Sequence, residues 1–222
     1  MCFSATASLS AGIVLTVIGI ASIRKVESSS QIVFASIPLV FAIQQFTEGL
    51  VWLSLSHTEF EPIHEIAMYA FLIFAQIIWP LWVPFAMLML EKNATRKKLL
   101  QILIVLGMIL ASYTAFAFLS YKVEAKIQGH HIEYLIDYPH EFNDFIAILY
   151  VISTILPPFL SSVKRMWILG IFILLTAIVT AIFYEVYLIS VWCFFAALMS
   201  VFVFGIMRGI EKPTKEFSTM KV

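Results

Sequence analysis

Charged residues are scarce in this 222-residue chain: 13% of the residues are charged, and 61% are apolar. A typical soluble domain is about 45–50% apolar and about 25% charged. The formal net charge is zero, so the chain has no overall attraction to nucleic acid. A soluble fold of this length cannot bury so much apolar surface. The composition therefore excludes soluble, disordered and nucleic-acid-binding proteins and predicts an integral membrane protein, with the lipid bilayer as its surroundings.

Cysteine is also scarce, since Cys2 and Cys193 are the only two. Two cysteines cannot form a disulfide scaffold or a four-cysteine metal site. Both are expected in the outer half of the protein, where they could pair as a disulfide or a redox couple. The alternative is two isolated, buried thiols that act as small apolar side chains. The N-terminus lacks the basic segment of a secretory signal, so the first apolar run is predicted to be a retained span.

Long apolar runs are plentiful, and a helix needs roughly 20 such residues to cross a bilayer. The sequence predicts an all-α fold: one membrane domain over residues 1–222 with seven transmembrane helices. The short polar break at 184–187 separates the last two. The predicted spans are about 8–23, 32–56, 66–90, 99–120, 145–163, 166–186 and 188–207.

The basic residues predict the orientation. Twelve of the 14 lie in the connections after the first, third, fifth and last spans, and only Lys122 and Lys126 lie on the other side. The positive-inside rule then places the N-terminus outside and the C-terminus in the cytoplasm. The outer side is acidic, and its longest connection, about 121–144, is expected to be a loop.

Three sequence blocks carry a family resemblance. The opening MCFSATAS resembles the start of a family of uncharacterised bacterial integral membrane proteins, a domain of unknown function. The stretches FAIQQFTEGLVWLSL (41–55) and WCFFAALMS (192–200) are similar to that family as well. The resemblance implies a multi-spanning protein of a bacterial inner membrane. It assigns no activity, cofactor or functional residue.

Familiar seven-span proteins do not fit. A retinal protein needs a lysine in the last span, and residues 190–207 contain none. A b-type cytochrome needs histidines inside the spans, and all five histidines lie outside them. One analogy remains, with 3+1+3 sugar-type transporters, because Glu48 and Trp52 in the second span have counterparts in Glu185 and Trp192 near the sixth.

The strongest candidate site is a polar face of the second predicted span. Gln44, Glu48 and Trp52 are spaced i, i+4, i+8 and so share one helix face, which Gln45 borders. A carboxyl group inside a membrane is costly unless it is paired, protonated or wetted, so it is a functional hypothesis by default. The alternative is a protonated glutamic acid that joins helices through hydrogen bonds.

The third predicted span is expected to form a facing wall. Gln76, Pro80 and Pro84 also follow i, i+4, i+8, and each proline removes a backbone hydrogen bond and bends the helix. Trp79 lies between them. Such a bend either lines a cavity or serves packing alone. Glu185, at the outer end of the sixth span, is either part of the pocket or a solvated interfacial residue, and Trp192 enters the last span from the same side.

The outer histidines offer metal ligands, chiefly His57, His64, His130 and His131. Their spacing matches no known site, so a solvated acidic face is the preferred interpretation and no metal is predicted.

Three functions remain open. The first is a transporter-like protein that handles a small solute or protons in a pocket around Glu48. The second is an intramembrane enzyme that acts on a lipid or a quinone-like substrate. The third is a sensor with a separate output partner. No cofactor can be assigned, and the oligomeric state is open.

Overall fold

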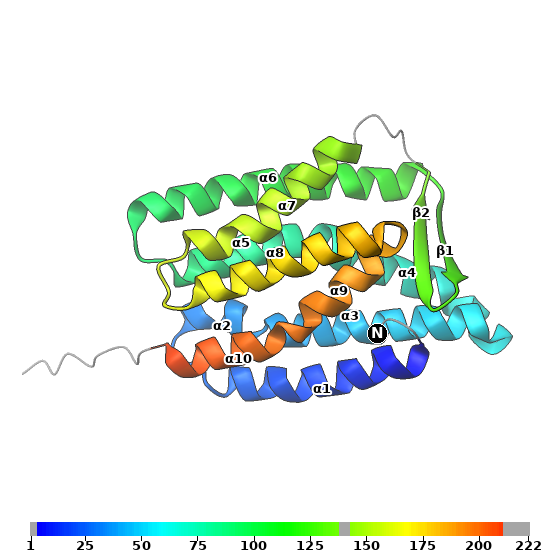
Figure 1. Cartoon of the computed structure of the whole chain (residues 1–222), viewed down its shortest axis with the longest axis horizontal. Coiled ribbons are helices and arrows are strands. Elements are labelled where there is room, and N and C mark those ends of the chain that lie inside the picture. Colours follow the sequence, from blue (N-terminus) through cyan, green and yellow to red (C-terminus); the bar gives the residue numbers. More distant parts are fainter. Residues whose placement is uncertain (1–3, 138–142, 211–222) are drawn as a thin grey trace, which may run out of the picture.

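A computed structural model describes residues 4–137 and 143–210 (Figure 1). The described chain is a bundle of helices along one long axis, with a two-stranded hairpin across one end. The α-helices are α1 (Ala5–Ile23), α2 (Ser29–Ala35), α3 (Ile37–Ser56), α4 (His64–Leu72), α5 (Trp79–Leu90), α6 (Ala94–Ser120), α7 (Asn143–Leu160), α8 (Met166–Phe183), α9 (Leu188–Leu198) and α10 (Ser200–Gly209). Two 3₁₀ turns, η1 (Thr58–Ile63) and η4 (Glu185–Tyr187), and one π-helix, η2 (Ile73–Ile78), complete the helical segments.

Each of the seven predicted segments is helical. Six helical stretches of the described chain are long and apolar enough to cross a membrane, which agrees with a multi-spanning protein. The fifth predicted segment differs, because its apolar helix, Phe145–Leu160 within α7, is shorter than a usual span. The six stretches are Ala5–Ile23, Ser29–Ser56, Thr58–Leu90, Ala94–Ser120, Met166–Phe183 and Glu185–Gly209.

The second predicted span is two helices joined at a bend. Ser36 separates α2 from α3, and its carbonyl accepts hydrogen bonds from the N–H groups of Leu39 and Val40. Pro38 lies in the first turn of α3, where its missing N–H costs nothing because that turn has no intrahelical partner. The bend therefore lies where the proline tolerates it, and α3 continues without interruption to Ser56.

The third predicted span contains the π-helix η2 immediately before Pro80. In η2 the N–H of Trp79 donates to the carbonyl of Phe74, five residues earlier. The next bond in this pattern would come from residue 80, and proline has no N–H. The carbonyl of Ala75 is thereby freed, and it accepts a hydrogen bond from the Tyr150 hydroxyl of α7 at 2.6 Å. The α-helix is thus interrupted before Pro80 by the π-turn, and the carbonyl of Ala75 gains a partner outside its own helix.

Close packing of α6 against this bend requires a glycine. A Cβ atom added at Gly107 would collide with the backbone carbonyl of Pro80. That carbonyl has lost its own helical donor, because the residue four positions later is Pro84. Gly107 therefore lets α6 lie directly against the proline-bent segment.

The described chain is helical as predicted, except in the connection 121–144, where the sequence analysis expected a loop and the structure has a small hairpin. β1 (Val123–Gln128) pairs antiparallel with β2 (His131–Ile136), and Gly129 turns between them with a φ of 62°. Alternate residues face the bundle, and Tyr134 stacks on Phe71 of α4 with ring centroids 4.9 Å apart. The hairpin thus covers one end of the helices with a period-2 apolar face.

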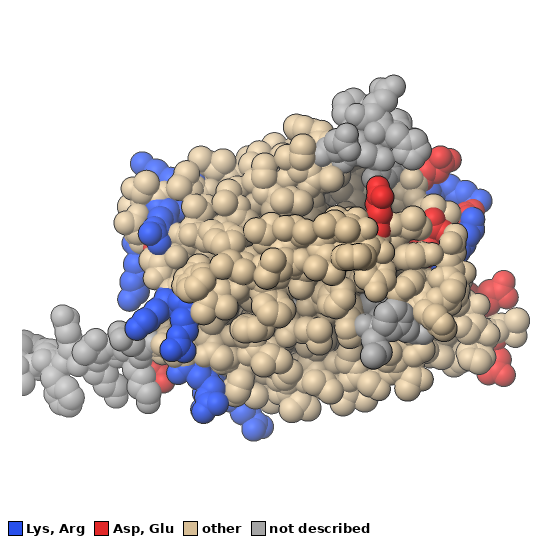
Figure 2. Space-filling model, viewed as in Figure 1, with Lys and Arg blue, Asp and Glu red and all other residues tan. Residues whose placement is uncertain are grey.

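The ends of the bundle differ in charge. Figure 2 shows a band without charged residues between one end with Lys and Arg and another end with Asp and Glu. Apolar helices form this band, and we call it the apolar band. We call the two ends the basic end and the acidic end. Lys122 and Lys126, on the hairpin at the acidic end, both pair with Glu124, at 2.5 and 2.7 Å. Two hydrogen bonds, the stronger effect coming from Lys122 and the weaker from Lys126, lower the pKa of Glu124 to about 2. Both of these cations therefore have an acidic partner on the hairpin.

Candidate functional site

A polar cluster lies on α3 inside the apolar band. Gln44, Gln45 and Glu48 are each fully buried, and Trp52 is 5% exposed. The Nε2 of Gln45 donates to Oε2 of Glu48 at 3.2 Å. The i, i+4, i+8 face expected from the sequence is therefore buried along its whole length.

The start of α5 contributes the next contact. Trp79 is 4% exposed, and its indole N–H donates to Oε1 of Gln44 at 2.6 Å. Its ring stacks on Phe41, one turn before Gln45 on α3, with centroids 3.9 Å apart. The π-turn and Pro80 lie directly before and after Trp79 in the chain, so the bent segment positions the indole against the polar face of α3.

The residue that completes the cluster, Ser190 of α9, was not expected from the sequence. Its hydroxyl donates to Oε1 of Glu48 at 2.5 Å, and both residues are fully buried. A single serine in an apolar run forms no pattern with α3, 142 positions away in the chain. Ser190 lies three residues before Cys193 and so shares the buried face of α9 with it. That spacing was the sequence signal that could have indicated its burial.

Several buried polar atoms of this region form no hydrogen bond with the described residues. They are Nε2 of Gln44, Oε1 of Gln45, and the indole N–H groups of Trp52 and Trp192. The Cys193 thiol, a weak acceptor, lies beside the Gln44 amide. Because more than nine in ten buried polar groups are normally paired, several such atoms in one region indicate a place for water or a ligand.

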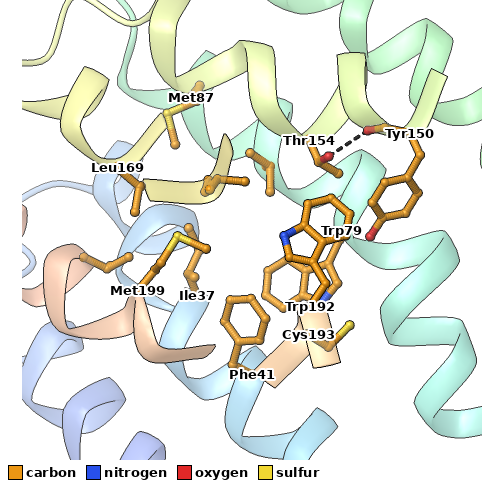
Figure 3. A pocket seen from close by; sticks show the side chains of 13 residues that line it. Ile37, Phe41, Trp79, Met87, Tyr150, Thr154, Leu169, Trp192, Cys193 and Met199 are labelled. Carbon is orange, nitrogen blue, oxygen red and sulfur yellow. Dashed lines mark hydrogen bonds between the residues drawn. The ribbon is translucent and has the colours of Figure 1, made fainter. Parts of the chain in front are cut away.

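A first cavity, of about 60 Å³, lies in the bundle between α3, α5, α7, α8, α9 and α10. Trp79, Trp192, Cys193, Phe41 and Tyr150 form one wall of it (Figure 3). On that wall the Thr154 hydroxyl donates to the backbone carbonyl of Tyr150 at 2.7 Å. The remaining lining is aliphatic and sulfur-containing, and comprises Ile37, Val83, Met87, Leu169, Ile173, Met199 and Val203. The volume holds a few water molecules or a small apolar group.

A second cavity, of about 260 Å³, lies between η2, α7, α8 and α9. It shares Tyr150, Trp192 and Cys193 with the first cavity, so these three side chains separate the two. Gln76, expected to face the Glu48 cluster, instead lines this second cavity and is half-buried. The bent third span therefore directs Trp79 toward the polar cluster and Gln76 toward a separate space.

Two further candidates lie apart from the cluster. Glu185, the first residue of η4, is exposed at the acidic end and lines neither cavity. The Cys193 thiol is buried in the wall between the cavities and forms no disulfide with another residue that the structure describes. Cys2 lies outside the described residues, so pairing of the two cysteines stays a prediction.

The four histidines in the described part of the chain lie at the acidic end. His64 Nδ1 is 2.9 Å from the Ser54 hydroxyl, while His57 and His130 are exposed. His131 stacks on Tyr187 with ring centroids 4.7 Å apart. Burial, and to a lesser extent the charge of the neighbouring His130, lowers the pKa of His131. Within residues 4–137 and 143–210, no three His, Cys, Asp or Glu side chains form a group that could hold a metal ion.

Comparison with known proteins identifies a family. The sequence profile of a family of unknown function (DUF6629) matches residues 1–218, almost the whole chain. No curated protein and no solved structure matches the chain. The match agrees with the resemblance carried by the MCFSATAS opening, and it leaves the activity to be argued from the site itself.

Proposed function

The chain belongs to the DUF6629 family of unknown function, and we propose that it is a transporter-like membrane protein that handles a small solute or protons at the Glu48 cluster. We also propose that it resides in a bacterial inner membrane with its acidic end outside. The distribution of Lys and Arg supports this orientation.

The burial of Glu48 is the observation that carries the proposal. Its side chain is fully buried between helices of an apolar bundle, and neutral amide and hydroxyl groups donate to both carboxyl oxygens. An apolar residue would pack there without the cost of placing a carboxyl group in a membrane. A carboxyl group, unlike an apolar side chain, can take up and release a proton, and this ability is a reason for its presence despite the free-energy cost.

The surroundings support handling of a solute. Gln44, four residues before Glu48, is linked to Trp79, and Trp79 lines the first cavity. Ser190 and Cys193 lie on the same helix, α9, and connect the carboxyl group to the wall between the cavities. A change of protonation at Glu48 would therefore alter the hydrogen bonds that hold this wall.

Proton flux in liposomes tests the proposal. Purified protein is reconstituted around a pH-sensitive dye, and proton uptake is followed after a pH gradient is imposed, with and without the low-molecular-weight fraction of a cell extract. We expect faster uptake than in empty liposomes, and a fall to that background in Glu48→Gln.

Thr180→Val is the matched control. It also replaces a fully buried polar group by a near-isostere, but its hydroxyl bonds only to the carbonyl of Thr176 on its own helix. It should keep the wild-type rate. A Glu48→Gln protein with the wild-type rate would refute the proposed role of Glu48.

A further inference from the structure

We propose that a pocket at the basic end binds a phosphate group, carried either by a lipid headgroup or by a soluble phosphate compound. The pocket lies between the start of α2, the α5–α6 connection, the α7–α8 connection and the end of α10, and its volume of about 510 Å³ is that of a ligand site. It shares no lining residue with the two cavities, so the inference goes beyond the proposed function. We call it the basic-end pocket, and its polar lining consists of Ser28, Ser30, Gln31, Lys92, Ser162 and Lys164.

Gln31 supplies a donor whose direction is fixed. Its side chain is 5% exposed, and its Oε1 accepts from the backbone N–H of Glu27 at 2.8 Å. Because only the oxygen of an amide accepts, this bond assigns the two ends of the group and leaves Nε2 with its hydrogens to donate. The Nε2 has no hydrogen-bond partner among the described residues, and it is not closed off from the solvent space. Since Gln31 lines the basic-end pocket, its amide hydrogens are available to an acceptor there.

Two lysines give the ligand its charge. Lys92 follows α5 and Lys164 precedes α8, both line the pocket, and neither forms an ion pair with a residue that the structure describes. Within residues 4–137 and 143–210 the basic end has two carboxyl groups, Glu27 and Glu91, and neither lines the pocket. A ligand that accepts from Gln31 beside two lysines is therefore an anion.

The serine hydroxyls favour a phosphate over a carboxylate. The Oγ atoms of Ser28 and Ser30 are 2.9 Å apart, so one hydroxyl donates to the other and one hydroxyl hydrogen remains to donate into the pocket. Together with the Gln31 amide and the two lysines, the serines surround the ligand with donors from several directions. A phosphate group presents more oxygens to such a set of donors than a carboxylate does.

Glu91 holds the walls of the pocket in place. Its carboxylate accepts from the backbone N–H of Lys92 at 2.9 Å, and from the N–H and the hydroxyl of Ser162 at 2.6 and 2.7 Å. The connections that carry Lys92 and Lys164 are thereby joined to each other. Walls that are fixed before the ligand arrives lose less conformational entropy when it binds.

Two titrations of the full chain in mild detergent test the inference and identify the source of the phosphate. Native mass spectrometry follows the binding of phosphatidylglycerol, with diacylglycerol of the same acyl chains as the probe that lacks the phosphate. Isothermal titration calorimetry follows the binding of inorganic phosphate. We expect phosphatidylglycerol to bind at least about tenfold more tightly than diacylglycerol if the source is a lipid, and inorganic phosphate to bind with saturation if the source is soluble.

The decisive variant is Gln31→Glu. Its carboxylate still accepts from the Glu27 N–H but puts a negative oxygen in place of the Nε2 donor, so affinity for the bound probe should fall at least about tenfold. The matched control is Gln101→Glu, which adds the same charge to α6 at an exposed residue outside the pocket. The control should lose less than about twofold.

The lysines give a second matched pair, which tests the pocket even if Gln31→Glu fails to fold. Lys92→Gln should weaken binding about threefold, whereas Lys98→Gln, at an exposed lysine of α6 outside the pocket, should bind as the wild type does. The inference is overturned if neither probe binds the wild type, or if each variant loses no more affinity than its control. None of these measurements depends on Glu48 or on proton flux.

Discussion

Glu91 shows how one carboxylate joins two connections at the basic end. It is 2% exposed, and its oxygens accept from the backbone N–H of Lys92, Asn93 and Ser162 and from the Ser162 hydroxyl, at 2.6–2.9 Å. Burial by itself raises the pKa of this carboxyl, but the hydrogen bonds from Asn93, Ser162 and Lys92 outweigh burial, so its pKa is lowered. The charged form is therefore the one that the fold stabilises.

The first prediction concerns Glu91→Gln. The amide keeps one acceptor oxygen and loses the charge, so we expect a loss of about 1–3 kcal/mol in the free energy of unfolding at neutral pH. Because the folded pKa lies below the unfolded one, this contribution is present above the usual carboxyl range and is lost as pH falls through the folded pKa. Thermal unfolding of both proteins across acidic pH measures it. Equal stability at neutral pH would contradict the prediction.

The second prediction concerns Ser190→Ala. Removing the hydroxyl takes one donor from the buried Glu48 carboxyl, so the protein should lose about 1–3 kcal/mol, measured by thermal unfolding in mild detergent. Ser8→Ala is the control, since Ser8 is also fully buried but its hydroxyl has no partner among the described residues. Equal losses in the free energy of unfolding for the two variants would show that the hydrogen bond from Ser190 to Glu48 does not stabilise the fold.

At the scale of single helices, the third prediction concerns Gly107→Ala. The new methyl group would meet the rigid Pro80 carbonyl and push α6 away from the bent segment, so we expect a loss of about 1–3 kcal/mol. Gly205→Ala in α10 adds a methyl group with nothing within 4 Å, and it should leave stability unchanged or raise it by up to about 1 kcal/mol. Thermal unfolding of the two variants gives the comparison, and equal losses would refute the close approach.

The helices and part of the site could be predicted because their signals are local. Apolar runs of sufficient length revealed the spans, and the i, i+4 spacing revealed the buried face of Gln44 and Glu48. The hairpin was missed because long apolar runs dominate this sequence, although the alternation in VEAKIQ and HIEYLI around a glycine turn is a strand signal. Ser190 could not be predicted, because its partner Glu48 lies on another helix. The pattern of apolar runs does not reveal which helices are neighbours in the bundle.

At the scale of the whole molecule, the fourth prediction concerns orientation. In a protein with Cys2 and Cys193 replaced by alanine, we expect His130→Cys, in the hairpin turn, to react with a membrane-impermeant maleimide on intact cells. Lys97→Cys, at the basic end, should react only after the cells are permeabilised. Both positions are exposed, so accessibility within the fold does not separate them. The reverse pattern would place the N-terminus in the cytoplasm.

The π-turn also keeps one long helix in phase with its neighbours. Buried residues recur every four positions from α4 through α5: Ala67, Phe71, Ala75, Trp79, Val83 and Met87. In a straight α-helix each step of four residues turns the face by about 40°, so five steps would carry the two ends about 200° apart. The wider turn at 73–78 takes back part of that rotation. The extra residue of this turn therefore helps to set the orientation of Trp79 toward Gln44, in addition to the identity of the side chains.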